Sequence, residues 1–301
     1  MDRLSRVLAA VDFSSPARRA FDYALALAKR HGAELVVVQA VPPEQPFNRK
    51  GRERLALKTS LQDMAERAQV QFTYRVQHGD PAEIILLHAQ SILPDVIVAG
   101  SHQRRGLSRL RAGSVSERVV ARATVPVLLI PASVRASATG AFGHVAVGAD
   151  LRAGSNGAVE RALAVAGDTA NRITLLHVVP GFSSGVPPQL HRYGVAEYQR
   201  QLVRDARRRL QLAVPARRLS GAAIHTRVLR GETTTELSQV VRNIGADLLI
   251  VGVPGRGVIG RALLGTTAAR LLKAIDIPLL AIPDVEQRTG RADHAPLRRA
   301  A

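Results

Sequence analysis

Short runs of valine, isoleucine and leucine alternate with longer amphipathic stretches along the whole chain. In the amino-terminal half the apolar runs predict strands at 6–11, 34–41, 69–77, 95–99 and 126–130, and helices near 50–67, 82–92 and 114–123. A further helix follows the first strand, with Ser15 as its expected N-cap and Pro16 as its first residue. Four of the strands lack polar alternation, which favours a parallel sheet buried on both faces. The pattern therefore predicts a doubly wound α/β domain with five parallel strands.

The same order of elements occurs twice. The segment Val7 to Asp12 (VLAAVD) reappears as Val145 to Asp150 (VAVGAD), and later glycines and prolines recur as well, with Gly79 aligning with Gly231. We therefore predict two tandem doubly wound five-stranded parallel-sheet domains. The predicted domains are residues 1–137 and 138–287, joined near 134–143, and residues 288–301 form a basic tail that we expect to be disordered. The second copy carries an extra segment around 181–198.

The amino-acid composition excludes several kinds of chemistry. The 301 residues contain no cysteine, which excludes disulfides, a thiolate nucleophile, cysteine-ligated zinc and iron–sulfur clusters. We find no P-loop and no His-Glu-x-x-His metal motif, so we predict no metal site. The apolar runs are too short for a membrane span, and the first residues lack the apolar core of a signal peptide. We expect a cytoplasmic protein with no membrane partner.

The chain is strongly basic, with 42 Lys and Arg against 24 Asp and Glu and a net charge of +18. Such a charge attracts phosphates of any kind. The excess is divided evenly between the halves, aromatic residues make up only 3%, and tryptophan is absent. Because base-stacking platforms are scarce, we regard nucleic acid as an unlikely partner.

Two features in each copy come directly after strands that should lie side by side. An aspartate closes the first strand (Asp12 and Asp150), and a glycine-rich stretch follows the fourth. In the second copy this stretch runs from Gly252 to Thr267. Ligands of open α/β sheets bind beyond the carboxyl ends of the strands, and a glycine-led helix start offers free N–H groups to an anion. We expect a phosphate group there.

After the fourth strand comes a motif of Gly, two residues, Gly, nine residues and Gly-Ser/Thr, and an aspartate ends the first strand. This combination resembles the universal stress protein family in its tandem form. The resemblance covers residues 4–133 and 143–285. It implies a Rossmann-like fold, similar to that of the adenine-nucleotide alpha hydrolases, and a site for ATP or AMP. Carried over by position, the nucleotide-binding residues are Asp150, Val178, Val179, Gly252, Gly255, Gly265, Thr266 and Thr267.

The first copy departs from this motif. Gln103 stands where the second glycine belongs, and a side chain there costs about 1 kcal/mol if the position needs a positive φ. We therefore predict that the nucleotide binds mainly in the second domain. The weaker site comprises Asp12, Val41, Gly100, Gly113 and Ser114.

Simpler interpretations remain open beside this one. Strand-to-helix turns need glycines whatever they bind, and Asp12 and Asp150 could serve as helix caps or loop carboxylates. The run Gly255 to Gly260 also fits a dinucleotide fingerprint, with Asp284 as the acidic residue, but it precedes the last strand of a repeat rather than opening the first βαβ unit. Arg104, Arg105, Arg256 and His102 are expected to be solvated loop residues.

The expected function is an ATP- or AMP-binding regulatory or stress-adaptation module. The alternative is a nucleotide-independent stress factor that contacts proteins or nucleic acid through the same fold. No residue is placed as an activated nucleophile or base, so we expect ATP hydrolysis to be slow or absent. The apolar last strands, 126–130 and 278–282, are expected to pair, so that the two domains form a pseudo-dimer, with a further homodimer open.

Overall fold

The computed structural model describes residues 3–44, 50–101, 115–134, 141–151, 170–181, 194–214, 221–253 and 266–283. Several sequence predictions fall outside these ranges. They concern Gly113, Ser114, Gly255, Gly265, the side chain of Thr266, most of the proposed linker and the predicted tail 288–301.

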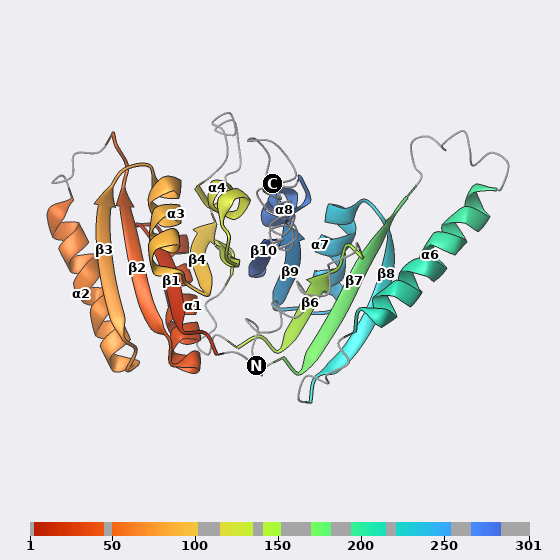
Figure 1. Ribbon diagram of the computed structural model, residues 1–301, viewed down its shortest axis with the longest axis horizontal. Coiled ribbons are helices and arrows are strands. Elements are labelled where there is room, and N and C mark those ends of the chain that lie inside the picture. Colours follow the sequence, from red (N-terminus) through yellow and green to blue (C-terminus); the bar gives the residue numbers. More distant parts are fainter. Residues whose placement is uncertain are drawn as a thin grey trace, which may run out of the picture.

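The first half contains the predicted elements in the predicted order (Figure 1). The first two strands agree with the prediction to the residue, and the other predicted boundaries differ by at most three residues. The strands are β1 (Arg6–Val11), β2 (Glu34–Val41), β3 (Phe72–His78), β4 (Val96–Ser101) and β5 (Val127–Pro131). The helices are α1 (Ser15–His31), α2 (Gly51–Arg67), α3 (Pro81–Ile92) and α4 (Val115–Arg122).

Two local predictions are corrected. The N-cap of α1 is Ser14 rather than Ser15, because the Ser14 Oγ accepts the Ala17 N–H at 3.3 Å and Pro16 is then the second helical residue. The third strand begins at Phe72 instead of residue 69. Gln69 has a φ of 57°, so the chain turns sharply out of α2 before it can extend.

The second half repeats this order in its described ranges. Its strands are β6 (His144–Gly148), β7 (Arg172–Pro180), β8 (Ala223–Gly231), β9 (Leu248–Val253) and β10 (Leu279–Pro283). Its helices are α6 (Val195–Leu212), α7 (Thr233–Asn243) and α8 (Thr266–Ala274). Helix α8 starts at Thr266, within the glycine-rich stretch 252–267.

All ten strands form one sheet, in the order β3-β2-β1-β4-β5-β10-β9-β6-β7-β8. Within each half the neighbouring strands are parallel, whereas β5 and β10 are antiparallel, with Leu279 opposite Leu129 and Ala281 opposite Val127. The predicted pairing of the two last strands is therefore confirmed. The halves meet at the centre of the sheet, and β3 and β8 are its two edges (Figure 1).

The helices divide between the two faces of the sheet. One apolar cluster contains residues of α1, α2 and α6, and the other contains residues of α3, α4, α7 and α8. Alternate residues of β5 enter opposite clusters, since Leu128 belongs to the first and Leu129 to the second. Each cluster includes strands from both halves, so the hydrophobic core is continuous across the junction.

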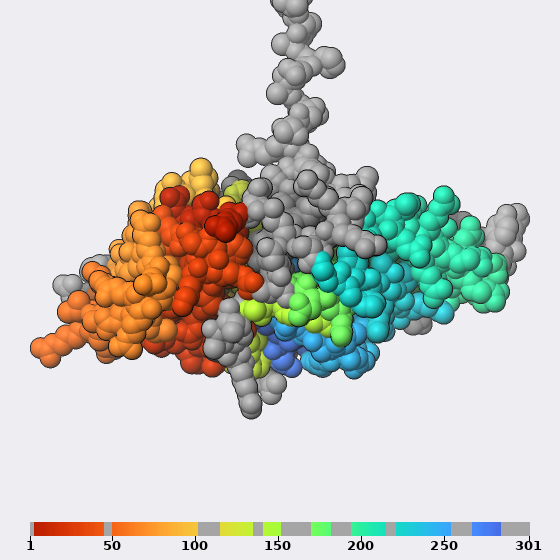
Figure 2. Space-filling view, turned by 90° about the horizontal axis from the view of Figure 1, so that it is seen from below, coloured from red at the N-terminus to blue at the C-terminus, as the bar shows by residue number. Residues whose placement is uncertain are grey.

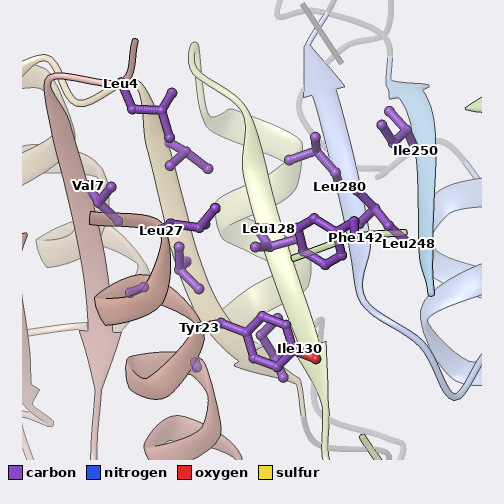
Figure 3. Packing of buried hydrophobic residues seen from close by; sticks show 14 of the residues in the cluster. Leu4, Val7, Tyr23, Leu27, Leu128, Ile130, Phe142, Leu248, Ile250 and Leu280 are labelled. Atoms are coloured by element: carbon purple, nitrogen blue, oxygen red, sulfur yellow. The ribbon is translucent and has the colours of Figure 1, made fainter. Parts of the chain in front are cut away.

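Phe142 connects the two halves. It lies near the predicted join of the two domains, is 1% exposed and belongs to the core. Its ring stacks on Tyr23 of α1 with centroids 6.2 Å apart (Figure 3). Phe142, at the start of the second half, thus packs against a helix of the first half. Two polar contacts also cross the junction: Lys273 with Glu117 at 3.2 Å, and Ser133 with Asp276 at 3.2 Å.

Among the described helices, none combines the length and the apolar character that crossing a bilayer requires.

Candidate functional site

In the first domain the predicted weaker site lies at the carboxyl ends of β1, β2 and β4. Ala10 is opposite Ala99, so Asp12 and Gly100 follow on adjacent strands at the same edge. The Asp12 Oδ1 accepts the Ser14 N–H at 2.8 Å and shapes the turn that leads into α1. Asp12 therefore has a structural task in addition to any contact with a ligand.

Gly100 and Val41 also have structural roles. A Cβ on Gly100 would lie 2.6 Å from the carbonyl carbon of Pro16, so only glycine lets the start of α1 pack against the end of β4. The Val41 side chain is buried, and its carbonyl accepts the Gly79 N–H at 2.9 Å. Asp12, Gly100 and Val41 thus lie at one edge of the sheet, as the sequence predicts, and each makes a contact that stabilises the local structure.

The second domain repeats this edge. Gly148 is opposite Val251, so Asp150 at the end of β6 and Gly252 in β9 lie on adjacent strands, as their counterparts do in the first domain. Asp150 is exposed to solvent. Gly252 is paired with Ile282 of β10. The Asp and the first glycine of the motif are therefore brought to one crevice-forming edge.

Val178 and Val179 end the neighbouring strand. Val179 is 4% exposed, and Val178 packs against the second apolar cluster, so their side chains belong to the core. Val179 therefore offers its backbone rather than its side chain to a ligand at this edge, whereas the Val178 side chain is partly exposed.

His177 is a residue that the sequence reasoning missed. Its Nδ1 donates to the Ala149 carbonyl at 2.8 Å, and the Ala149 N–H donates to the Leu176 carbonyl, also at 2.8 Å. These two bonds hold the peptide immediately before Asp150. The signal was available, because His177 is the polar residue in an otherwise apolar run and aligns with Gln39 in the first copy.

Helix α8 begins at Thr266, and Thr267 is half-buried in its first turn. The start of α8 therefore faces the same edge of the sheet as the end of β9, with the glycine-rich stretch between them. The first N–H groups of a helix lack intrahelical acceptors and carry the positive end of the helix dipole. Free N–H groups together with the positive end of a helix dipole favour the binding of an anion.

Ion pairs tie α4 to α3 in the first domain. Arg118 bonds Asp80 at 2.8 Å and Glu83 at 3.3 Å, and Arg122 bonds Glu83 at 2.8 Å. The Arg118 guanidinium lowers the pKa of Asp80, and Arg122 lowers that of Glu83.

In the second domain the corresponding contact between α7 and α8 is a single pair, Arg270 with Glu232 at 3.7 Å, because Thr235 and Ala274 replace Glu83 and Arg122. The pKa of Glu232 is lowered to about 2, chiefly by the Thr235 backbone N–H that it caps. Arg242 of α7 also donates to the Ala274 carbonyl at the end of α8 at 2.5 Å and pairs with Asp276 at 3.6 Å, so the contacts between the described parts of α7 and α8 are distributed differently from those between α3 and α4.

A buried histidine at the start of β6 gives the second domain a pH-dependent element. The His144 Nδ1 donates to the Ile244 carbonyl at 3.0 Å, and its Nε2 accepts from the Thr174 hydroxyl at 2.9 Å. Burial lowers the pKa of His144, opposed by the Ile244 carbonyl and by Asp247 and assisted by Arg172 and His225. The folded state therefore favours the neutral ring.

Because the unfolded chain binds this proton more readily, His144 stabilises the fold above pH about 6.5 and loses that contribution as the pH falls below it. Urea unfolding between pH 7.5 and 5.5 should show a steeper loss of stability for the wild type than for His144→Gln. Equal slopes in the two proteins would contradict this role.

The described residues contain no group of three or more histidine, aspartate or glutamate side chains placed to hold a metal ion.

Comparison with known proteins places this fold in one family. A model described as the universal stress protein family matches residues 4–131 and again 141–283. A universal stress protein from Thermus aquaticus is 36% identical over 132 residues, spanning 41% of this chain and 96% of the relative, and YxiE from Bacillus subtilis is 30% identical over 145 residues, spanning 42% and 98%. A solved universal stress protein from Archaeoglobus fulgidus matches 93% of this chain and 96% of its own, with a TM-score of 0.69 and 18% identity. The chain belongs to the universal stress protein family and carries two copies of its domain in tandem.

Proposed function

We propose that this protein is an adenine-nucleotide-binding regulatory or stress-adaptation module and that the nucleotide, ATP or AMP, binds in the second domain. The observation that carries the proposal is the complete motif of Gly252, Gly255, Gly265 and Thr266, which leads from the end of β9 into the start of α8. Backbone N–H groups at a turn and at a helix start can donate several hydrogen bonds to phosphate oxygens.

The neighbouring strand ends supply the rest of the proposed site. Asp150 would accept hydrogen bonds from ribose hydroxyls or from the base, and the backbone of Val178 and Val179 would contact the adenine. His177 would hold the peptide before Asp150 in place. The first domain would bind nucleotide more weakly, because Gln103 interrupts its motif.

Calorimetry with ATP tests the proposal. We expect saturable binding with about one nucleotide per chain and at least a tenfold loss of affinity in Gly255→Gln, because the new side chain hinders the approach of phosphate to the backbone. Gln103→Gly is the complementary variant, since it restores the motif in the first domain and should raise the stoichiometry.

Titrations with AMP, adenosine and cyclic AMP identify the preferred ligand. Adenosine should bind more weakly than ATP if the glycine motif holds phosphate. Unchanged affinity in Gly255→Gln, with a fold intact by circular dichroism, would rule the site out. In that case the second candidate, a nucleotide-independent interaction factor, would be favoured.

A further inference from the structure

One helix and its neighbouring strand, at one end of the molecule, form a strongly basic surface. Helix α6 and its neighbour β8 together carry seven arginines, and their acidic residues are Glu197 and Asp205 alone. The corresponding elements of the first domain, α2 and β3, carry five basic residues and three acidic ones. Helix α6 lies at the end of the molecule farthest from the first domain (Figures 1 and 2).

Most of these arginines lie on one side of α6. Ala206 and Leu210 are its buried residues and mark the side that faces the sheet. At 100° per residue, Arg200, Arg204, Arg207 and Arg208 fall within a stripe about 100° wide on the opposite side. All four are exposed, and Arg200 and Arg204 expose 65% and 62% of their side chains. The arginine stripe, defined by these four residues, is about 12 Å long.

The stripe is only partly neutralised. Arg200 and Arg204 both bond Glu197, at 2.7 and 2.8 Å, and they lower the pKa of that carboxyl. Arg207 and Arg208 have no carboxylate within ion-pair distance in the part of the chain that the structure describes. Glu197 thus acts as an internal counterion for one end of the stripe.

We propose that the arginine stripe binds the phosphate backbone of double-helical DNA without reading its sequence. Each strand of a duplex carries one phosphate per about 3.4 Å of the helix axis, so a 12 Å stripe laid along one strand runs past about three or four phosphates. Guanidinium groups bind phosphate through paired N–H donors. The scarcity of aromatic side chains argues against stacking on single strands, but backbone contacts to a duplex need none.

Two features of α6 favour a DNA duplex over a protein partner or an RNA duplex. The stripe consists of arginines with glutamine and Glu197 among them, and the large apolar residue that α6 exposes is Leu212 in its last turn, whereas protein interfaces depend on a buried cluster of apolar or aromatic residues. The major groove of B-form DNA, about 12 Å wide, admits an α-helix, whereas that of an RNA duplex is deep and narrow. Because α6 stands at the edge of the molecule, it can approach such a groove from outside.

The salt dependence of binding to a fluorescent 20-base-pair DNA duplex tests this proposal by anisotropy. Four arginine–phosphate contacts predict a slope of log K against log salt of about −3.6, so affinity should fall about 150-fold between 50 and 200 mM NaCl. In the double variant Arg207→Gln/Arg208→Gln the slope should approach about −1.8, and affinity should fall about 12-fold over the same salt range. Glu197→Gln, which releases Arg200 and Arg204, should strengthen binding.

Matched variants on α2 are the controls. Arg52→Gln/Arg67→Gln removes the same charge from the other end of the molecule, and Glu53→Gln removes a carboxylate that lies 4.0 Å from Lys50. Neither control should alter the slope. ATP affinity should be the same in all these proteins, so this proposal and the nucleotide proposal can fail separately.

Three results would overturn the proposal. They are absence of duplex binding at 50 mM salt, equal weakening by the α6 and α2 double variants, and equally tight binding of an RNA duplex or of poly-glutamate.

Discussion

Replacing Phe142 with alanine should lower the free energy of unfolding by about 3–5 kcal/mol, the largest effect that we expect from a single substitution in this chain. The ring is 1% exposed and packs against Tyr23 of α1, so its removal leaves a cavity between the two halves. Neither half can close that cavity alone, because the central strands β5 and β10 fix their spacing. Urea unfolding followed by circular dichroism at 25 °C measures the change.

Phe13→Ala is the matched control, since the same atoms are removed from a side chain that is 43% exposed and stacks with Lys50 at 4.7 Å. This substitution should lower the free energy of unfolding by about 1 kcal/mol or less. If Phe142→Ala were as mild as Phe13→Ala, the continuous core across the junction would be disproved.

Gly100→Ala should destabilise the protein by about 3 kcal/mol through overcrowding. The added methyl group would lie 2.6 Å from the Pro16 carbonyl carbon and 2.8 Å from the Ala17 nitrogen. These are backbone atoms in the first turn of α1, so they cannot rotate away and the helix must shift. The shift would also disturb the turn that Asp12 orders through Ser14.

Gly51→Ala provides the comparison. A Cβ at Gly51, the first residue of α2, meets no described atom within 4 Å, so alanine should be neutral or should stabilise the fold by about 0.4–1 kcal/mol. Chemical denaturation of the two variants side by side separates close packing from the general cost of losing a glycine. Equal stabilities would show that the contact between β4 and α1 tolerates a side chain.

The fold could be predicted from sequence because it depends on short-range patterns. Apolar runs such as 34–41 are long enough to identify buried parallel strands, and the repeat gives each element a second, independent occurrence. The pairing of β5 with β10 followed from the apolar character of both strands. The predicted boundaries were wrong where a single hydrogen bond or dihedral angle sets the end of an element, as at Ser14 and Gln69.

The site was predictable only in part. The aspartates and glycines at the strand ends come to one edge because parallel topology places them there. The contacts that support this edge could not be inferred, because they join residues distant in sequence: Arg118 reaches Asp80, and a Cβ on Gly100 would meet Pro16. The burial of Phe142 was missed for the same reason, since its partner lies 119 positions earlier in the chain. The nucleotide site stays a prediction.

The central β5–β10 pair joins two halves of one polypeptide. Separate subunits that met through such strands would come apart on dilution, and identical subunits would always form like pairs. Here the partner is tethered, so its effective concentration does not depend on how much protein the cell makes. Each molecule therefore always combines one half with an interrupted glycine motif and one half with a complete motif. Covalent linkage has made an unequal pair permanent, which leaves each half free to diverge toward its own task.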